Sequence, residues 1–100
     1  MICKVIYQPT ALDDIEDAFD YVRKETYSWD IAKDYAEKIM NQVDMLAFFP
    51  EIGCRLEGYE LDSKNLRTLS LGDYVIYYEY DRNKVEILYI WHSKKLPPSL

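Results

Sequence analysis

The chain lacks the features that mark secreted and membrane proteins. It has 100 residues, two cysteines (Cys3 and Cys54) and no apolar stretch approaching the ~18 residues of a membrane span. A domain of this size buries a real core without a disulfide, so both cysteines are interpreted as reduced thiols. Met1-Ile2-Cys3-Lys4 leads into a strand-like run and not into a signal peptide. We therefore expect one soluble, cytoplasmic domain over residues 1–100, with no cofactor, metal or membrane contact.

Positive charge is also scarce. The chain has 12 Lys and Arg against 18 Asp and Glu, a net charge of −6, and most of the acidic excess lies in residues 1–50. An acidic protein repels polyanions at long range, which argues against a general nucleic-acid binder. Residues 51–100 are nearly balanced in charge, so a local basic site there stays open.

Strand-like runs fill the last third of the chain. Residues 66–71, 74–80 and 85–91 are rich in β-branched and aromatic side chains, and Gly72-Asp73 and the turn residues 81–84 separate them. Short polar connections between such runs are the strongest local signal for antiparallel hairpins. A further strand is expected over residues 2–7, ended by Pro9.

Two amphipathic helices are predicted between these strands. Thr10, with Asp13 three residues later, is expected to cap a helix over about 11–25, and Ser28 to cap a second over 28–47. Side chains at helical spacing are expected to be buried, namely Leu12, Ile15, Phe19, Ala36, Ile39, Val43 and Leu46. Residues 50–65 have no clear periodicity and are expected to form the one long loop.

The order β-α-α-β-β-β predicts an α+β fold, in which a two-helix antiparallel hairpin packs on a mainly antiparallel four-stranded sheet. Two helices cover only one face of such a sheet, and alternation does not say which face, because both are apolar. An apolar open face usually marks a partner site. If the hairpin register is regular, Tyr77, Tyr89 and Trp91 share one side, and we expect these large aromatics to anchor a partner.

Five motifs in a fixed order give the chain a family resemblance. They are Pro9-x-Ala11-x-x-Asp14-Ile15, Leu46-x-x-Phe49-Pro50-x-x-Gly53, Leu66-Arg67-x-Leu69, Tyr74-Val75-Ile76-Tyr77-Tyr78 and Ile87-x-x-Ile90-x-His92. With the layout above, the chain resembles the RelE/ParE superfamily of toxins from type II toxin–antitoxin systems, the plasmid stabilisation or addiction modules. The resemblance covers nearly the whole chain, and it implies a cognate antitoxin as partner.

The resemblance implies two alternative ways of inhibiting growth. RelE-like members are ribosome-dependent endoribonucleases (mRNA interferases), in which a 2′-hydroxyl attacks the neighbouring phosphate. That reaction needs a proton acceptor, a proton donor and fixed positive charge. ParE-like members instead bind and poison DNA gyrase. Ribosome with mRNA, or gyrase, therefore both stand as targets at this point.

The candidate catalytic residues follow from the first alternative. Arg67 would hold the scissile phosphate and His92 would transfer a proton. Nuclease members typically carry an arginine directly after the residue that opens the strand following the hairpin, where this chain has Val75, so Arg55 or Lys94 would have to supply that charge. Loss of a group that stabilises the transition state costs about 2.7–4 kcal/mol of barrier, which argues against nuclease activity.

Structural roles for these residues are equally open. Arg67 could pair with Glu79 or Glu86 on a neighbouring strand, and His92 could be a packing residue.

A third interpretation is an inactive toxin-fold protein that acts only as a protein-binding module, because toxins of this type are usually basic and this chain is acidic. If an antitoxin covers the acidic first helix, its covering segment should contain Lys or Arg. A homodimer is also left open.

Overall fold

The computed structural model describes residues 2–56 and 65–95, and its elements confirm the α+β prediction. They are β1 (Lys4–Tyr7), α1 (Pro9–Thr26), α2 (Trp29–Met45), β2 (Cys54–Arg55), β3 (Leu66–Leu71), β4 (Tyr74–Asp81) and β5 (Lys84–His92). All the predicted helices and strands are present, with ends within two residues of those expected. Of the loop expected over 50–65, residues 57–64 lie outside the described residues.

The sheet has five strands in the order β1-β5-β4-β3-β2, and β1 pairs with β5 in the one parallel pairing. The prediction of four strands was wrong because β2 has two residues, too few to carry a hydrophobic pattern. Its residues Cys54 and Arg55 lie opposite Thr68 and Arg67 of β3. The β4–β5 turn has Arg82 and Asn83 at φ values of 45° and 50°, which is typical of the two-residue hairpin turn that fits the twist of the strands.

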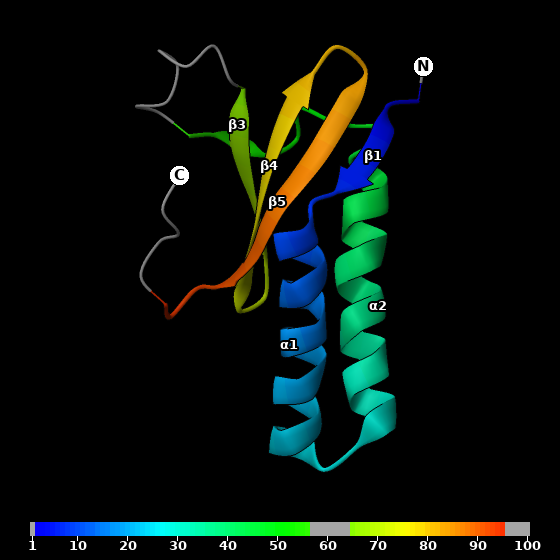
Figure 1. Ribbon diagram of the computed structural model, residues 1–100, viewed down its shortest axis with the longest axis vertical. Coiled ribbons are helices and arrows are strands. Elements are labelled where there is room, and N and C mark those ends of the chain that lie inside the picture. The colour runs from blue at the N-terminus through cyan, green and yellow to red at the C-terminus, as the bar shows by residue number, and fades with distance from the viewer. Residues whose placement is uncertain (1, 57–64, 96–100) are drawn as a thin grey trace.

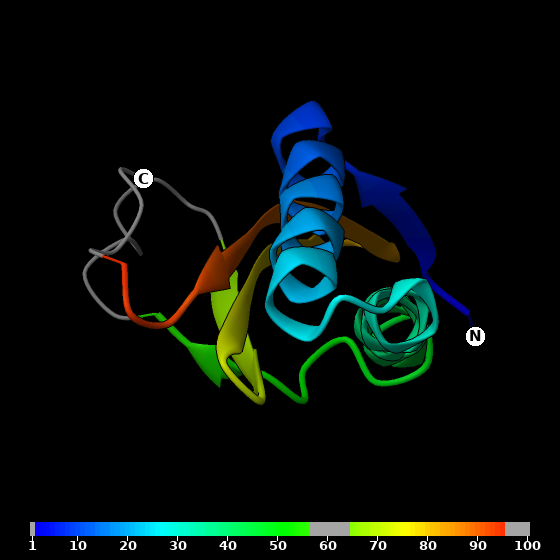
Figure 2. The same ribbon diagram turned by 90° about the horizontal axis from the view of Figure 1, so that it is seen from below.

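Both helices lie on one face of the sheet, and their hairpin extends past the end of the strands (Figures 1 and 2). The structure resolves which face is covered, since Tyr74, Ile76 and Tyr78 of β4 are buried. They pack with Ile39, Val43 and Leu46 of α2 and with Val85, Ile87 and Ile90 of β5. The register of β4 against β5 shifts between Tyr77 and Tyr78. Because of this bulge, Ile87 and Ile90 both face the core although they are three residues apart.

The inward face of α1 differs from the prediction. Leu12 is 53% exposed, whereas Ala11 and Ala18 are fully buried, so the covered stripe begins one residue earlier than expected. Ile15, Phe19 and Ala36 are half-buried, and the expected Ile39, Val43 and Leu46 are buried. The two small alanines let α1 approach the sheet closely. This close packing stabilises the fold more than burial of the larger Leu12 side chain would, so Leu12 stays exposed. Neither helix of the described ranges is long and apolar enough to cross a bilayer.

The two predicted helix caps had different outcomes. Ser28 caps α2 as expected, since its hydroxyl accepts a hydrogen bond from the Ile31 N–H at 3.2 Å. The cap of α1 is Gln8, not Thr10, and it makes no side-chain capping bond. The Thr10 hydroxyl instead donates to the Leu88 carbonyl of β5 at 2.6 Å. A contact with a distant strand therefore replaces the local capping box.

Candidate functional site

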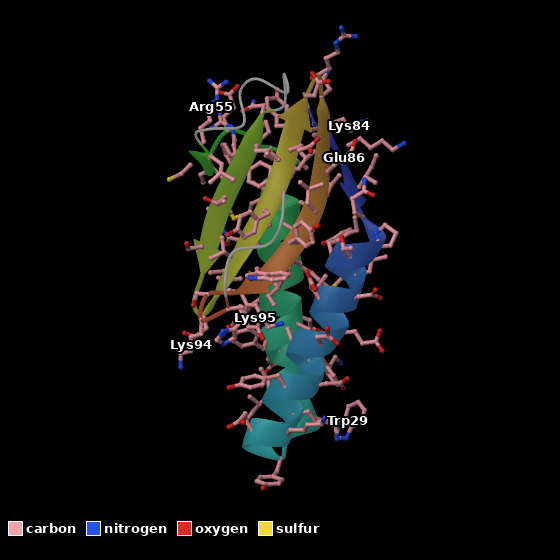
Figure 3. The ribbon with its side chains drawn as sticks, turned by 60° about the vertical axis from the view of Figure 1, so that its left-hand side comes forward. Trp29, Arg55, Lys84, Glu86, Lys94 and Lys95 are labelled. Carbon is pink, nitrogen blue, oxygen red and sulfur yellow. The ribbon has the colours of Figure 1, made fainter. Side chains whose placement is uncertain are left out.

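The predicted catalytic residues do not converge. Arg67 lies opposite Tyr78 of β4, whereas His92 lies opposite Tyr74. These two tyrosines are four residues apart on β4, which corresponds to roughly 13 Å of strand. Arg55 lies opposite Arg67 on the neighbouring strand, and Lys94 follows His92 by two residues. Figure 3 shows Arg55 and Lys94 at opposite ends of the sheet. No single concave spot gathers the four residues.

Arg67 is bound to the backbone at the end of α2. Its Nη1 donates to the Gly53 carbonyl at 2.9 Å and to the Glu51 carbonyl at 3.2 Å. The same turn is held by the buried Tyr78 hydroxyl, which accepts from the Gly53 N–H at 2.9 Å and donates to the Pro50 carbonyl at 2.8 Å. Arg67 thus anchors a turn. Its partners are backbone carbonyls, whereas the structural role predicted from the sequence was a pair with Glu79 or Glu86.

Gly53 is required by this packing. A Cβ on Gly53 would lie 2.5 Å from the Tyr78 hydroxyl oxygen and 2.8 Å from the Thr68 carbonyl oxygen. These separations are well inside van der Waals contact, so only glycine fits against the Tyr78 hydroxyl and the Thr68 carbonyl. The glycine that ends the second motif of the sequence therefore has a steric role.

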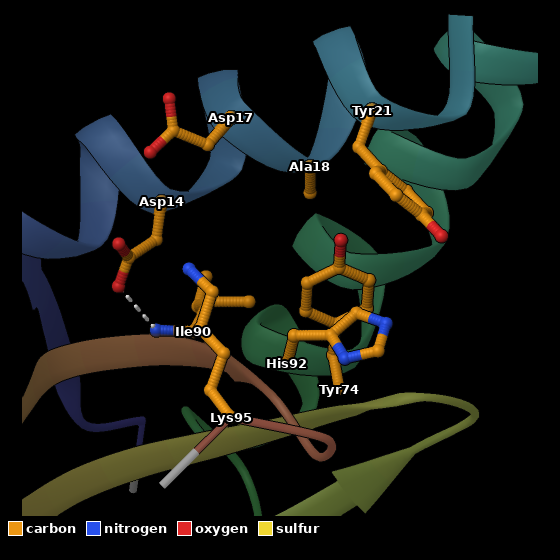
Figure 4. A pocket seen from close by; sticks show the side chains of 8 residues that line it. All are labelled: Asp14, Asp17, Ala18, Tyr21, Tyr74, Ile90, His92 and Lys95. Atoms are coloured by element: carbon orange, nitrogen blue, oxygen red, sulfur yellow. Dashed lines mark hydrogen bonds between the residues drawn. The ribbon is translucent and has the colours of Figure 1, made fainter. Parts of the chain in front are cut away.

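His92 lies in a cavity between α1 and the ends of β4 and β5 (Figure 4). The cavity has a volume of about 370 Å³. Its lining comprises two carboxylates, three rings, two apolar side chains and one ammonium, from Asp14, Asp17, Ala18, Tyr21, Tyr74, Ile90, His92 and Lys95. We call this the α1–β5 cavity.

Ring contacts hold His92 in place. Its ring lies edge-on to Tyr74 at 5.1 Å between centroids and to Tyr21 at 5.9 Å. The Nδ1 atom accepts the backbone N–H of Lys94 at 3.2 Å, so a neutral His92 carries its proton on Nε2. Burial, with smaller contributions from Tyr35 and Tyr21, raises the pKa of Tyr74 to about 12, and its phenol stays neutral at ordinary pH.

Asp14 joins α1 to β5 inside the cavity. Its Oδ2 accepts the Ile90 N–H at 3.0 Å, at a point where β5 has passed the end of β1. Burial raises the pKa of Asp14, and the Ile90 N–H and the Lys95 ammonium oppose this in part. In the sequence, Asp14 stood out only as a member of the first family motif. A signal was available, because Asp14 lies three and four residues from the inward-facing Ala11 and Ala18.

The three predicted partner-binding aromatics form a row on the open face. The rings of Tyr77 and Tyr89 are 6.5 Å apart and those of Tyr89 and Trp91 are 5.6 Å apart, all edge-on. The Lys95 ammonium lies 5.2 Å from the centre of the Trp91 ring. That the three share one face is confirmed, and their role in partner binding stays a prediction.

The remaining predicted cations are solvent-facing. Arg55 and Lys94 are both exposed, and Arg55 lies directly across from the like charge of Arg67. No group of His, Cys, Asp or Glu within 2–56 and 65–95 has the arrangement of a metal site. Arg55 and Lys94 therefore do not join a cluster that includes Arg67 and His92 together.

The comparisons with known proteins first define the fold. The structure matches a solved structure described as "Chromosomal ParDE TA system from P. aeruginosa" with a TM-score of 0.73. The match covers 93% of this chain and 98% of that chain at 17% sequence identity, so it shows a shared fold. No curated protein matches the chain significantly.

The family follows from the sequence match. A family model described as "ParE toxin of type II toxin-antitoxin system, parDE" matches residues 5–97. The chain therefore belongs to the ParE toxin family of type II toxin–antitoxin systems. Of the two branches that the resemblance left open, the family match favours the ParE branch.

Proposed function

We propose that this protein is the toxin of a ParDE-type module, that it inhibits growth by binding DNA gyrase, and that a cognate antitoxin neutralises it. The observation that carries the choice of target is the separation of Arg67 from His92. Proton transfer and phosphate stabilisation work only within hydrogen-bond reach of the reacting atoms. Arg67, bound to the carbonyls of Glu51 and Gly53, is already used to hold the fold.

Gyrase inhibition makes a different demand on the protein. It requires a surface that binds one state of a large enzyme, and no constellation of acids and bases. The row of Tyr77, Tyr89 and Trp91 supplies rigid aromatic area of the kind that dominates protein interfaces. The same row, or the helix hairpin, is the proposed site of the antitoxin.

Controlled expression in a bacterial host tests the proposal. Induction of the protein alone should stop growth and switch on a reporter of DNA breakage, because a poisoned gyrase leaves broken DNA. Co-expression with the antitoxin reading frame should restore growth and yield a complex on purification. Toeprinting of ribosomes from the same cells should show uncut mRNA. Cleaved mRNA without DNA breakage would refute the choice of gyrase.

The net charge of −6 favours one second candidate, a toxin-fold protein that has kept only partner binding. In that case the induced protein leaves growth unchanged and still co-purifies with its antitoxin. The growth assay separates the two candidates, because only the active toxin needs the antitoxin for survival of the host.

A further inference from the structure

We propose that the α1–β5 cavity binds the cationic side chain of an arginine from the protein partner that covers α1. The inference rests on the proposed function only for the source of that arginine, the antitoxin. The site itself is defined by this chain. It combines two carboxylates with a set of rings, and no residue of the cavity has a role in the toxic activity proposed above.

The carboxylates are placed to receive a guanidinium. Asp14 and Asp17 are three residues apart on α1, so they lie on the same side of the helix and line the same cavity. Asp14 accepts one hydrogen bond, from the Ile90 N–H, and a carboxylate has about four lone-pair positions. Capacity for a charge-assisted bond therefore remains, and Arg pairs with carboxylates in a planar, two-pronged geometry.

The rings provide the other half of the site. Tyr21, Tyr74 and His92 meet edge to face on the side of the cavity away from Asp14, as Figure 4 shows. Ala18 and Ile90 add apolar lining. A planar cation stacks on aromatic faces and is attracted by their quadrupole, and a phenol with its pKa raised to about 12 stays neutral beside it. Carboxylates facing rings suit an alkyl guanidinium better than an anion or a neutral ligand.

The chain's own Lys95 already brings a cation to the rim. Its side chain lines the cavity, and its ammonium lowers the pKa of Asp14, which burial raises. Lys95 is exposed, and its ammonium also lies 5.2 Å from the centre of the Trp91 ring. The Lys95 ammonium thus already contacts the aromatic row, and it can keep this contact when the partner's arginine enters the cavity.

A titration with a minimal ligand tests the site without any partner protein. The probe is Nα-acetyl-arginine amide, compared with its neutral isostere Nα-acetyl-citrulline amide, followed by the amide NMR signals of the ¹⁵N-labelled full chain. We expect saturable shifts at Ile90 and His92 with the arginine probe and none with citrulline. Asp14→Asn and Asp17→Asn should each weaken binding by about fivefold, the upper end for a partly exposed ion pair.

Asp13→Asn is the matched control, since it removes the same charge from the same exposed turn of α1 outside the cavity lining. Asp14→Asn keeps an oxygen acceptor for the Ile90 N–H, so its fold should survive. Equal shifts with citrulline, no saturation up to roughly 50 mM probe, or equal weakening by Asp13→Asn would overturn the site. Failure of growth inhibition in the host would overturn the proposed toxin and leave this binding result standing.

Discussion

The hydroxyl of Tyr78 offers the most direct energetic test of the fold around Arg67. Tyr78 is fully buried, and its hydroxyl joins the Gly53 N–H and the Pro50 carbonyl to the sheet. Tyr78→Phe keeps the ring but leaves both backbone groups without this partner. A buried group that loses its partner costs about 1–3 kcal/mol, and the half-buried Pro50 carbonyl can turn to water. We expect a loss of about 2 kcal/mol in the free energy of unfolding.

Urea denaturation and thermal melting both measure this loss. For a domain of this size a loss of about 2 kcal/mol lowers Tm by roughly 10 °C. Tyr77→Phe is the matched control, because Tyr77 is the neighbouring residue on the open face, where its ring stays in contact with Tyr89. It should change stability by less than about 0.5 kcal/mol. Equal losses in the two variants would refute the assignment of the turn to the Tyr78 hydroxyl.

Three further predictions concern the stability contributions of Gly53, Arg67 and Asp14. Gly53→Ala should lower the urea midpoint by an amount equivalent to about 1–3 kcal/mol, because its Cβ overlaps a backbone carbonyl of β3. Arg67→Ala should cost about 2 kcal/mol for two carbonyl contacts, whereas Arg55→Ala, which relieves a like-charge pair, should stay within about 0.5 kcal/mol. Burial raises the pKa of the Asp14 carboxyl, so the folded state binds this proton more tightly than the unfolded state does. The free energy of unfolding therefore falls as the pH rises above the unfolded pKa of about 3.9 and Asp14 ionises. Asp14→Asn should therefore gain stability relative to the wild type between about pH 3 and pH 7, measured by urea denaturation, and a constant difference would contradict this sign.

The helices and long strands could be predicted from sequence because their signals are local. The stripe of Ile39, Val43 and Leu46 repeats at helical spacing, and Ser28 caps α2 with a bond that spans only three residues. The prediction that Thr10 caps α1 failed because its hydroxyl binds the carbonyl of Leu88, a residue of β5 that is distant in sequence. A local sequence pattern does not show when such a distant hydrogen-bond partner replaces a local one.

The site was predicted less well, for the same reason. The aromatic row was predicted because cross-strand neighbours follow from hairpin register, and Tyr77 does lie opposite Tyr89. The role of Arg67 depends on backbone carbonyls of a turn, which no residue type reveals. The α1–β5 cavity depends on how α1 is rotated over β5, and that rotation is set by Ala11 and Ala18, two residues too small to stand out in a hydrophobic pattern.

Gyrase binding, and not mRNA cleavage, is the proposed action of this ParE family member. The most direct test is supercoiling of relaxed plasmid by purified gyrase with ATP, in the presence of increasing amounts of the folded protein. We predict inhibition that rises with protein concentration and disappears when the antitoxin is added. Undiminished supercoiling at saturating protein, together with cleaved mRNA on ribosomes given the same preparation, would contradict the account.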